Sequence, residues 1–447
     1  MKYEKWSLGY AILKQYIRIT QWVIHKEVKV IGLENIPKNK PLVIAPNHQN
    51  GLSDPMSVLL HTYFQPVWLA RADIFKKPLV ILILRFLKIM PVYRMRDGKE
   101  QLSKNEETFA ASIKVLENNF PLALFPEAAH SSKRQMLSHK KAVPRIVFMA
   151  EERTEKNLDI QIIPTGIYYS SYWKFNRSII VNFGKPVCVN DYLKTYATNP
   201  KQATAKLRED LRAAIHQQII DIQSKNYYDD FENIRKIYSR TNTENSGKKA
   251  TLLNRFTCDQ KLVEKLCYLE ENNPEETESL VKQTRVFSSL LKNYKLRSWL
   301  LTHPGKNIPM ILLNIITLLV FSPVFIFGFI FNALPFFALD IPIRKKMKDQ
   351  GFWSTFSFAG SLLLFPIAYL IELGIIVWWL PKLWMGIVLL ICFPLSLKFG
   401  FRWYILLRKT VGRVRLFLLK VFKKSEFTEI VESRDSLFKM LKENSIY

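Results

Sequence analysis

Cysteine and glycine are both scarce in this chain of 447 residues. The four cysteines show no Cys-x-x-Cys spacing and no matching histidine cluster, which argues against a disulfide framework and against a zinc site. We therefore expect a reducing compartment, no bound metal and no cofactor. The 15 glycines, set against 30 Phe, 18 Tyr and 10 Trp, exclude collagen-like, low-complexity and disordered chains. The composition predicts a folded protein with a substantial apolar core.

Acidic residues are also few, at 38 against 65 Lys and Arg, and the formal net charge is +27. Such an excess predicts binding to polyanions, either nucleic acid or an anionic membrane surface. The apolar residues separate these two classes. Residues 310–339 contain no charge, and residues 353–397 contain only Glu372 and Lys382. Because roughly 20 apolar residues suffice to cross a bilayer, we predict an integral membrane protein.

The basic residues also fit a membrane better than nucleic acid. The densest run, 402–424, holds eight Lys or Arg and no acid, and its apolar residues recur at helical spacing, as in an interfacial helix on anionic lipid. We therefore predict no nucleic-acid partner. Three basic regions flank the apolar blocks, namely the N-terminal domain, the loop 344–348 and the tail, and the positive-inside rule places all three on the cytoplasmic side. The shorter apolar run 78–90 is either a core helix or an interfacial segment.

Short β-rich runs alternate with helical patterns in the first half of the chain, which is typical of an α/β domain with a mixed sheet flanked by helices. A charged, helix-like region follows, with a linker near 241–248, and then the membrane helices. The β-rich runs are 28–31, 42–45, 67–70, 122–125, 160–167 and 178–183. The predicted domains are an amphipathic helix over 1–27, the α/β domain over 28–195, an accessory helical region over 196–305, membrane-embedded helices over 306–400 and a basic amphipathic tail over 401–447.

The sharpest local motif follows the second predicted strand and reads Asn47-His48-Gln49-Asn50-Gly51-Leu52-Ser53-Asp54. A histidine near neutral pKa can take a proton from an alcohol when a carboxylate fixes its tautomer. Asp54 can supply that carboxylate. It precedes a proline, however, and Asp-Pro is also a regular helix start, in which the carboxylate only caps the helix. Backbone N–H groups at this helix start are candidate donors to an oxyanion.

Three further segments carry candidate binding residues. Phe125-Pro126-Glu127 ends a strand and is followed by Lys133, which suits a small phosphorylated substrate, although such residues are common in loops. Arg94 and Arg96 can bind phosphate, although surface ion pairs are their commoner use. In Pro164-Thr165-Gly166, a proline and a glycine stand among apolar residues, which permits close approach of a ligand or forms a buried bend.

The order of these blocks, from His48 and Asp54 through Arg94 and Phe125-Pro126-Glu127 to Pro164-Thr165-Gly166, resembles the glycerol-phosphate and lysophosphatidate acyltransferase family over residues 28–190. The resemblance implies that His48 is the general base and that Asp54 orients it. It also implies that Arg94 and Glu127 bind the acceptor phosphate, and we predict Arg96 and Lys133 as further phosphate-binding residues from their own chemistry. The implied pocket residues are Asn47, Phe125, Pro126, Pro164, Thr165 and Gly166.

The sequence departs from the common family pattern at two places. Five residues separate His48 from Asp54 where the family usually has four, a spacing that resembles the fungal-type glycerol-3-phosphate and dihydroxyacetone-phosphate acyltransferases. Ala128 replaces the glycine that usually follows Pro-Glu, which puts the backbone geometry of that loop in doubt because glycine reaches dihedral angles that alanine avoids.

The resemblance implies transfer of a fatty acyl group from an acyl thioester, carried by coenzyme A or acyl carrier protein, to a hydroxyl of glycerol 3-phosphate. The alternative acceptor is 1-acylglycerol 3-phosphate. Direct attack by the alcohol needs no enzyme nucleophile, which fits the absence of a Gly-x-Ser-x-Gly motif. A membrane-tethered lipid-binding or scaffold protein without activity is the alternative from another class. A transporter is disfavoured because the apolar blocks contain few charges.

Overall fold

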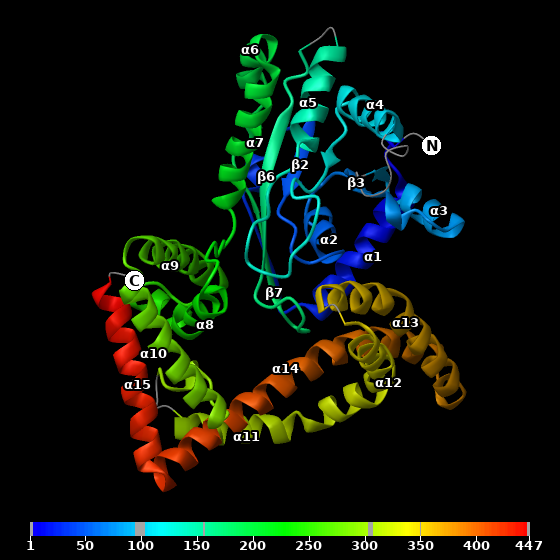
Figure 1. The fold of residues 1–447 in the computed structure, drawn as a ribbon. Helices are drawn as coiled ribbons and strands as arrows, with labels where there is room; N and C mark the ends of the chain where they lie inside the picture. Colours follow the sequence, from blue (N-terminus) through cyan, green and yellow to red (C-terminus); the bar gives the residue numbers. More distant parts are fainter. Residues whose placement is uncertain (1–2, 94–102, 155–156, 303–306, 349, 445–447) are drawn as a thin grey trace. The chain divides into compact units, whose positions relative to one another are not determined.

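The computed structural model describes residues 3–93, 103–154, 157–302, 307–348 and 350–444 (Figure 1). The chain divides into two compact units. The N-terminal unit comprises Met1–Ile219 together with Met347–Phe358, and the C-terminal unit comprises Ile220–Lys346 together with Ala359–Tyr447. Each unit is described by itself.

The N-terminal unit contains an eight-stranded mixed sheet in the order β1-β7-β6-β2-β5-β3-β4, with β8 pairing to β6. The pairs are parallel except those that β6 forms with β7 and β8. Every predicted β-rich run forms a strand, whereas β4, which contains Pro91, and the two-residue β8 were not predicted. The strands are β1 (Glu27–Ile31), β2 (Leu42–Pro46), β3 (Val67–Arg71), β4 (Ile89–Val92), β5 (Leu122–Ala123), β6 (Gln161–Tyr169), β7 (Ser178–Phe183) and β8 (Val187–Cys188).

Apolar side chains cover both faces of this sheet. Along β2, Val43 and Ala45 belong to one core cluster while Leu42 and Ile44 belong to the other, as the two-residue period of a strand requires. Helices α4, α5 and α7 contribute to the first cluster, and α7 packs against β6 and α5 (Figure 1). The helices of this unit are α1 (Leu8–Ile24), α2 (Ser53–Leu59), α3 (Pro78–Phe86), α4 (Lys104–Glu117), α5 (Ala142–Arg153), α6 (Asn190–Thr198) and α7 (Pro200–His216).

Helix α3 has no buried residue, so the core-helix interpretation of the run 78–90 is wrong for this helix. Leu79 and Leu82 are 68% and 67% exposed. Only the end of the run is buried, because Met90 belongs to β4. Helix α1 likewise presents Leu8 and Ile12 to the outside. Two helices of the unit therefore carry outward apolar surface that no other described residue covers.

The C-terminal unit is helical in the described residues. Helices α8 and α9 pack together, and a buried ion pair of 2.7 Å joins Arg235 of α8 to Asp259 of α9. The predicted linker near 241–248 lies partly inside α8, because the polar residues Asn242 and Thr243 are buried in the helix packing. The helices are α8 (Tyr228–Asn245), α9 (Leu252–Asn272), α10 (Pro274–Asn293), α11 (Asn307–Val320), α12 (Ser322–Lys346), α13 (Trp353–Ile376), α14 (Leu383–Phe422) and α15 (Lys424–Glu443).

Three segments are long and apolar enough to cross a membrane: Ser322–Lys346, Gln350–Trp379 and Leu383–Phe422. The apolar block 310–339 is divided between the 14-residue α11 and the 25-residue α12. Only α12 meets the length needed for a span. Helix α14 continues unbroken past the boundary predicted at residue 400. These properties indicate membrane association.

A buried polar cluster connects three of the apolar helices. The side-chain amide of Asn332 on α12 donates to Ser396 Oγ on α14 at 3.0 Å, and its carbonyl oxygen accepts a 2.6 Å bond from Tyr369 on α13. Gly328 allows close contact with Ser396. Hydrogen bonds and small residues of this kind hold helices together where lipid removes the hydrophobic driving force.

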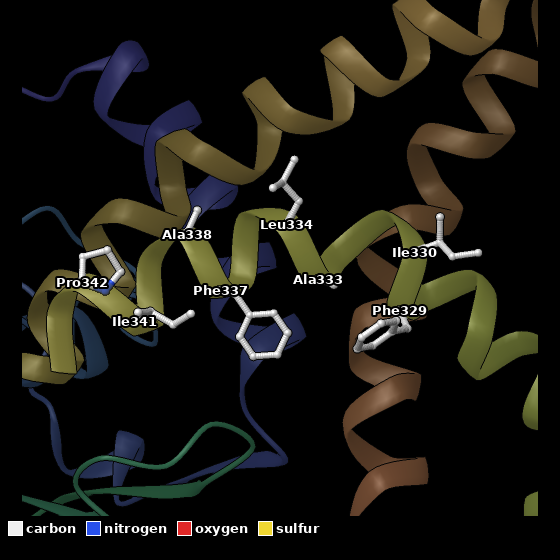
Figure 2. A pocket seen from close by; sticks show the side chains of 8 residues that line it. All are labelled: Phe329, Ile330, Ala333, Leu334, Phe337, Ala338, Ile341 and Pro342. Carbon is white, nitrogen blue, oxygen red and sulfur yellow. The ribbon is translucent and has the colours of Figure 1, made fainter. Parts of the chain in front are cut away.

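An open groove of about 640 Å³ runs along α12 (Figure 2). Only apolar side chains line it, and all of them belong to this one helix: Phe329, Ile330, Ala333, Leu334, Phe337, Ala338, Ile341 and Pro342. The groove therefore offers no group for acid–base chemistry or phosphate binding. The candidate chemistry lies in the N-terminal unit.

Candidate active site

The motif residues follow strands that end at one edge of the sheet. His48 comes two residues after β2, and Glu127 follows β5, which is parallel to β2. Strand β4 is parallel to β3, and β3 to β5, so Val92 also ends at this edge. The carboxyl ends of parallel strands are the usual place for ligands in α/β folds. Arg94 and Arg96 lie outside the described residues, and their role stays a prediction.

His48 and Asp54 form a direct hydrogen bond. Their Nδ1 and Oδ2 atoms are 2.8 Å apart, and the same Oδ2 accepts the backbone N–H groups of Gln49 and Asn50, both at 2.7 Å. Asp54 is completely buried, whereas the side chain of His48 is 16% exposed. Helix α2 begins at Ser53, and Asp54 bonds the loop before the helix. The contacts of Asp54 are therefore those of an orienting carboxylate, and its interpretation as the N-cap is wrong.

A tyrosine that the sequence interpretation missed holds the other oxygen of Asp54. The Tyr169 hydroxyl donates to Asp54 Oδ1 at 2.9 Å and lies 3.1 Å from Ser57 Oγ. Burial and the nearby Asp54 charge raise the pKa of Tyr169, so the hydroxyl stays protonated and donates. The Arg177 guanidinium lies 4.6 Å from the centre of the Tyr169 ring. The one sequence signal for Tyr169 is a hydroxyl at the end of a largely apolar strand.

Aromatic rings fix the plane of the His48 imidazole. Phe125 stacks on it with ring centres 3.9 Å apart and an angle of 14°. His130 lies beside it, with ring centres 5.4 Å apart. Because Nδ1 is bonded to Asp54, Nε2 is the nitrogen that remains to exchange a proton with a substrate. The site therefore presents an oriented imidazole on a partly exposed side chain.

Glu127 is buried and holds the loop that carries His48. One carboxylate oxygen accepts the backbone N–H of His48 at 3.0 Å, and the other accepts that of Leu137 at 3.0 Å. These contacts position the histidine. Lys133 is exposed and follows Ser131, whose N–H donates to the carbonyl oxygen of His48 at 3.3 Å. Phosphate binding by Glu127 and Lys133 stays a prediction.

The remaining predicted pocket residues support the site from inside the sheet. The Asn47 side chain is buried and bonds both the N–H and the carbonyl of Ile167 on β6. Pro164, Thr165 and Gly166 lie in the fully buried β6. A Cβ on Gly166 would lie 2.1 Å from the carbonyl oxygen of Gln218, so the lack of a side chain here lets the backbone of Gln218 approach β6. Lining of a substrate pocket by these residues stays a prediction.

The backbone N–H groups near the start of α2 already have partners. Those of Gln49 and Asn50 bond Asp54, and that of Ser53 bonds the carbonyl of Asn50. The N–H of Leu52 donates to Thr355 Oγ1 at 3.0 Å. To stabilise an oxyanion, these four N–H groups would first have to break the hydrogen bonds that they now form.

Ala128 adopts a left-handed conformation, with φ of +56°, where the common family pattern has glycine. Alanine pays roughly 1–2 kcal/mol for this region, whereas glycine loses about 0.5–1 kcal/mol through a more flexible unfolded chain. Ala128 is exposed, so its methyl group contributes little packing. We predict that Ala128→Gly raises the stability of the protein by about 0.5–1 kcal/mol. A lower midpoint of thermal or chemical unfolding than in wild type would contradict this.

Comparisons with known proteins find similarity to acyltransferases. Residues 27–168 match the family described as Acyltransferase. A curated protein from Borreliella burgdorferi, named 1-acyl-sn-glycerol-3-phosphate acyltransferase, is 23% identical over 210 residues, which are 46% of this chain and 78% of that protein. Among solved structures, the 1-acyl-sn-glycerophosphate (LPA) acyltransferase PlsC from Thermotoga maritima matches with 18% identity and a TM-score of 0.34, over 47% of this chain and 78% of that chain.

The match at residues 27–168 contains the hydrogen-bonded His48 and Asp54, the stacked Phe125 and the buried Glu127. Residues 27–168 therefore match the acyltransferase family, and the chain is similar to a 1-acyl-sn-glycerol-3-phosphate acyltransferase.

Proposed function

We propose that this protein is a membrane-bound acyltransferase that moves a fatty acyl group from an acyl thioester to a hydroxyl of a phosphorylated glycerol, with His48 as general base. The observation that carries the proposal is the 2.8 Å contact between His48 Nδ1 and the buried carboxylate of Asp54, inside an acyltransferase domain. This contact favours the tautomer with the proton on Nδ1 and leaves Nε2 as the acceptor of a proton.

The proposed reaction proceeds by direct attack. The acceptor oxygen attacks the thioester carbonyl carbon while His48 Nε2 takes its proton, and the charge on the resulting imidazolium is balanced by Asp54. The tetrahedral intermediate then collapses, the carbon–sulfur bond breaks, and the imidazolium returns the proton to the leaving thiolate. Phe125 holds the imidazole plane through both transfers. A positioned base of this kind contributes about 10²–10⁴ to the rate.

Two acceptors are candidates, and a different observation favours each. The five residues between His48 and Asp54 resemble the fungal-type enzymes and favour glycerol 3-phosphate. The curated relative from Borreliella burgdorferi favours 1-acylglycerol 3-phosphate by its name.

The deciding experiment offers each acceptor with an acyl-coenzyme A and an acyl carrier protein donor to the detergent-solubilised protein and identifies products by mass. Lysophosphatidate alone would establish the first acceptor, and phosphatidate the second. No acyl ester with any pair would contradict the proposed activity and favour a binding or scaffold protein.

We predict that Arg94→Ala raises the Michaelis constant for the phosphorylated acceptor by about tenfold or more, because a charge-assisted contact to phosphate is lost. The constant for the acyl donor is expected to change much less. Lysine at this position should rescue only partly, since it lacks the planar fork of donors. Steady-state kinetics with each substrate varied in turn measures both constants. Equal weakening toward both substrates would identify a structural arginine instead.

The proposed location is an integral membrane protein with the acyltransferase domain on the cytoplasmic side, supported by the three apolar helices and the basic regions that flank them. The uncovered apolar residues of α1 and α3, such as Ile12 and Leu79, would then enter the lipid interface beside the site. Such a placement keeps a long acyl chain in apolar surroundings.

A further inference from the structure

A short segment far from the motifs in sequence lies on the loop that carries His48 and Asp54. Residues Met347–Phe358 group with the N-terminal unit, although the chain before and after them belongs to the C-terminal unit. The hydroxyl oxygen of Thr355 accepts the N–H of Leu52 at 3.0 Å, and Ser354 donates to the side-chain oxygen of Asn50. Both partners lie between His48 and Asp54. The segment lies outside the residues that match the acyltransferase family.

The backbone at Gly51 fits closely against Thr355, which indicates that the loop accommodates this contact. Gly51 has a φ of +42°, and a Cβ at this position would lie 2.4 Å from Thr355 Oγ1. A side chain there would displace Thr355 and strain the backbone. Glycine thus lets the segment approach the loop closely enough for the hydrogen bond to Leu52.

The same segment brings an apolar ring against His130, which is the neighbour of His48. Phe352 packs edge-on against His130, with ring centres 4.9 Å apart, and His130 lies beside His48. Phe352 ends a short 3-10 helix, Gln350–Phe352, and Trp353 begins α13. The segment therefore touches the loop through its hydroxyl groups and the histidine pair through an aromatic ring.

We propose that residues 351–355 complete the active site, with Thr355 as a positioning residue that holds the His48–Asp54 loop and Phe352 as an apolar neighbour of the histidine pair. This inference rests on the proposed acyltransferase function. In the chain the segment follows α12 and opens α13, both of which are long enough to cross a membrane. The catalytic loop is thereby held by the first turn of α13.

The kinetic test compares Thr355→Val with Thr355→Ser in the full-length protein. Valine keeps the shape and removes the acceptor of the Leu52 N–H, so kcat should fall about tenfold while both Michaelis constants stay within about twofold. Serine keeps the hydroxyl and should restore kcat to within about twofold of wild type. Thr428→Val, at an exposed position of α15, is the matched control and should leave kcat unchanged. Unchanged kcat in Thr355→Val would overturn the inference, as would equal loss in Thr355→Ser and Thr355→Val.

A cross-linking experiment detects the contact between Ser354 and Asn50 without an activity assay. The pair Asn50→Cys with Ser354→Cys should form a disulfide under mild oxidation, because their side chains touch. A protease site introduced at Gly247, in the exposed turn after α8, then separates the two cysteines along the chain. On a denaturing gel, the oxidised and cleaved double variant should migrate as one band, and reduction should separate it into two. The single variant Ser354→Cys should give two bands both before and after reduction. Two bands in the oxidised double variant would overturn the inference.

These tests separate failure of the inference from failure of the proposed function. If His48→Ala keeps its turnover, the function is wrong whatever Thr355 does. If His48→Ala is inactive while Thr355→Val turns over like wild type, the function stands and the placement of Thr355 in the active site is wrong.

Discussion

Replacement of His48 by alanine is expected to abolish acyl transfer, with a loss of at least about 10²–10⁴ in kcat. The reason is geometric. The imidazole is oriented by Asp54 at 2.8 Å and by the Phe125 ring, and alanine leaves no group at that position to take the acceptor proton. The measurement is the initial rate of acyl ester formation by purified protein in detergent.

A matched control guards against loss by unfolding. His216→Ala changes a histidine at the end of α7 that has no assigned role in the site, and it should keep full activity. His48→Ala should fractionate with membranes and unfold at a temperature close to that of wild type. A folded His48→Ala protein with near-normal turnover would rule out His48 as the base.

Asp54→Asn should lower kcat by about 10²–10⁴ while the protein still folds. The amide oxygen of asparagine can accept the two loop N–H groups that now bond Asp54 Oδ2, so the loop keeps part of its support. The negative charge that stabilises the imidazolium is lost, so His48 becomes a weaker base. A steady-state rate with both substrates saturating measures this effect.

A purely structural role for Asp54 makes the opposite forecast. If the carboxylate only supported the loop through the N–H groups of Gln49 and Asn50, the asparagine oxygen could accept the same bonds and the change would cost little activity. Asp191→Asn is the matched control, because Asp191 is an exposed aspartate in the first turn of α6. Equal and small effects of the two substitutions would contradict the orienting role of Asp54.

The sheet could be predicted because its strands are local patterns. The run Leu42–Ala45 alternates between the two core clusters, and Ile160–Ile167 is apolar enough to be buried on both faces. Strand β4 was missed because Pro91 interrupts a short run, and a strand of four residues carries little pattern. The predicted linker near 241–248 overlaps the end of helix α8. Asn242 and Thr243 are polar residues typical of a linker, although both are buried in this helix.

The candidate site was predictable only where its residues are close in sequence. The pairing of His48 with Asp54 follows from a five-residue spacing after a strand. Tyr169 is 115 residues from its partner Asp54, and Thr355 is 303 residues from its partner Leu52. A local sequence pattern cannot predict contacts between residues so far apart in the chain. The departure at Ala128 was visible in the sequence, and its left-handed backbone was not.

The central claim is that this protein transfers an acyl group to a phosphorylated glycerol, and the most direct measurement follows both products of that reaction in the wild-type protein. Purified full-length protein is given an acyl thioester with either glycerol 3-phosphate or 1-acylglycerol 3-phosphate, and free thiol and acyl ester are quantified together. The account predicts that thiol and ester appear in a one-to-one ratio and only when an acceptor is present. Thiol release that is independent of any acceptor, or no thiol release with either one, would contradict it.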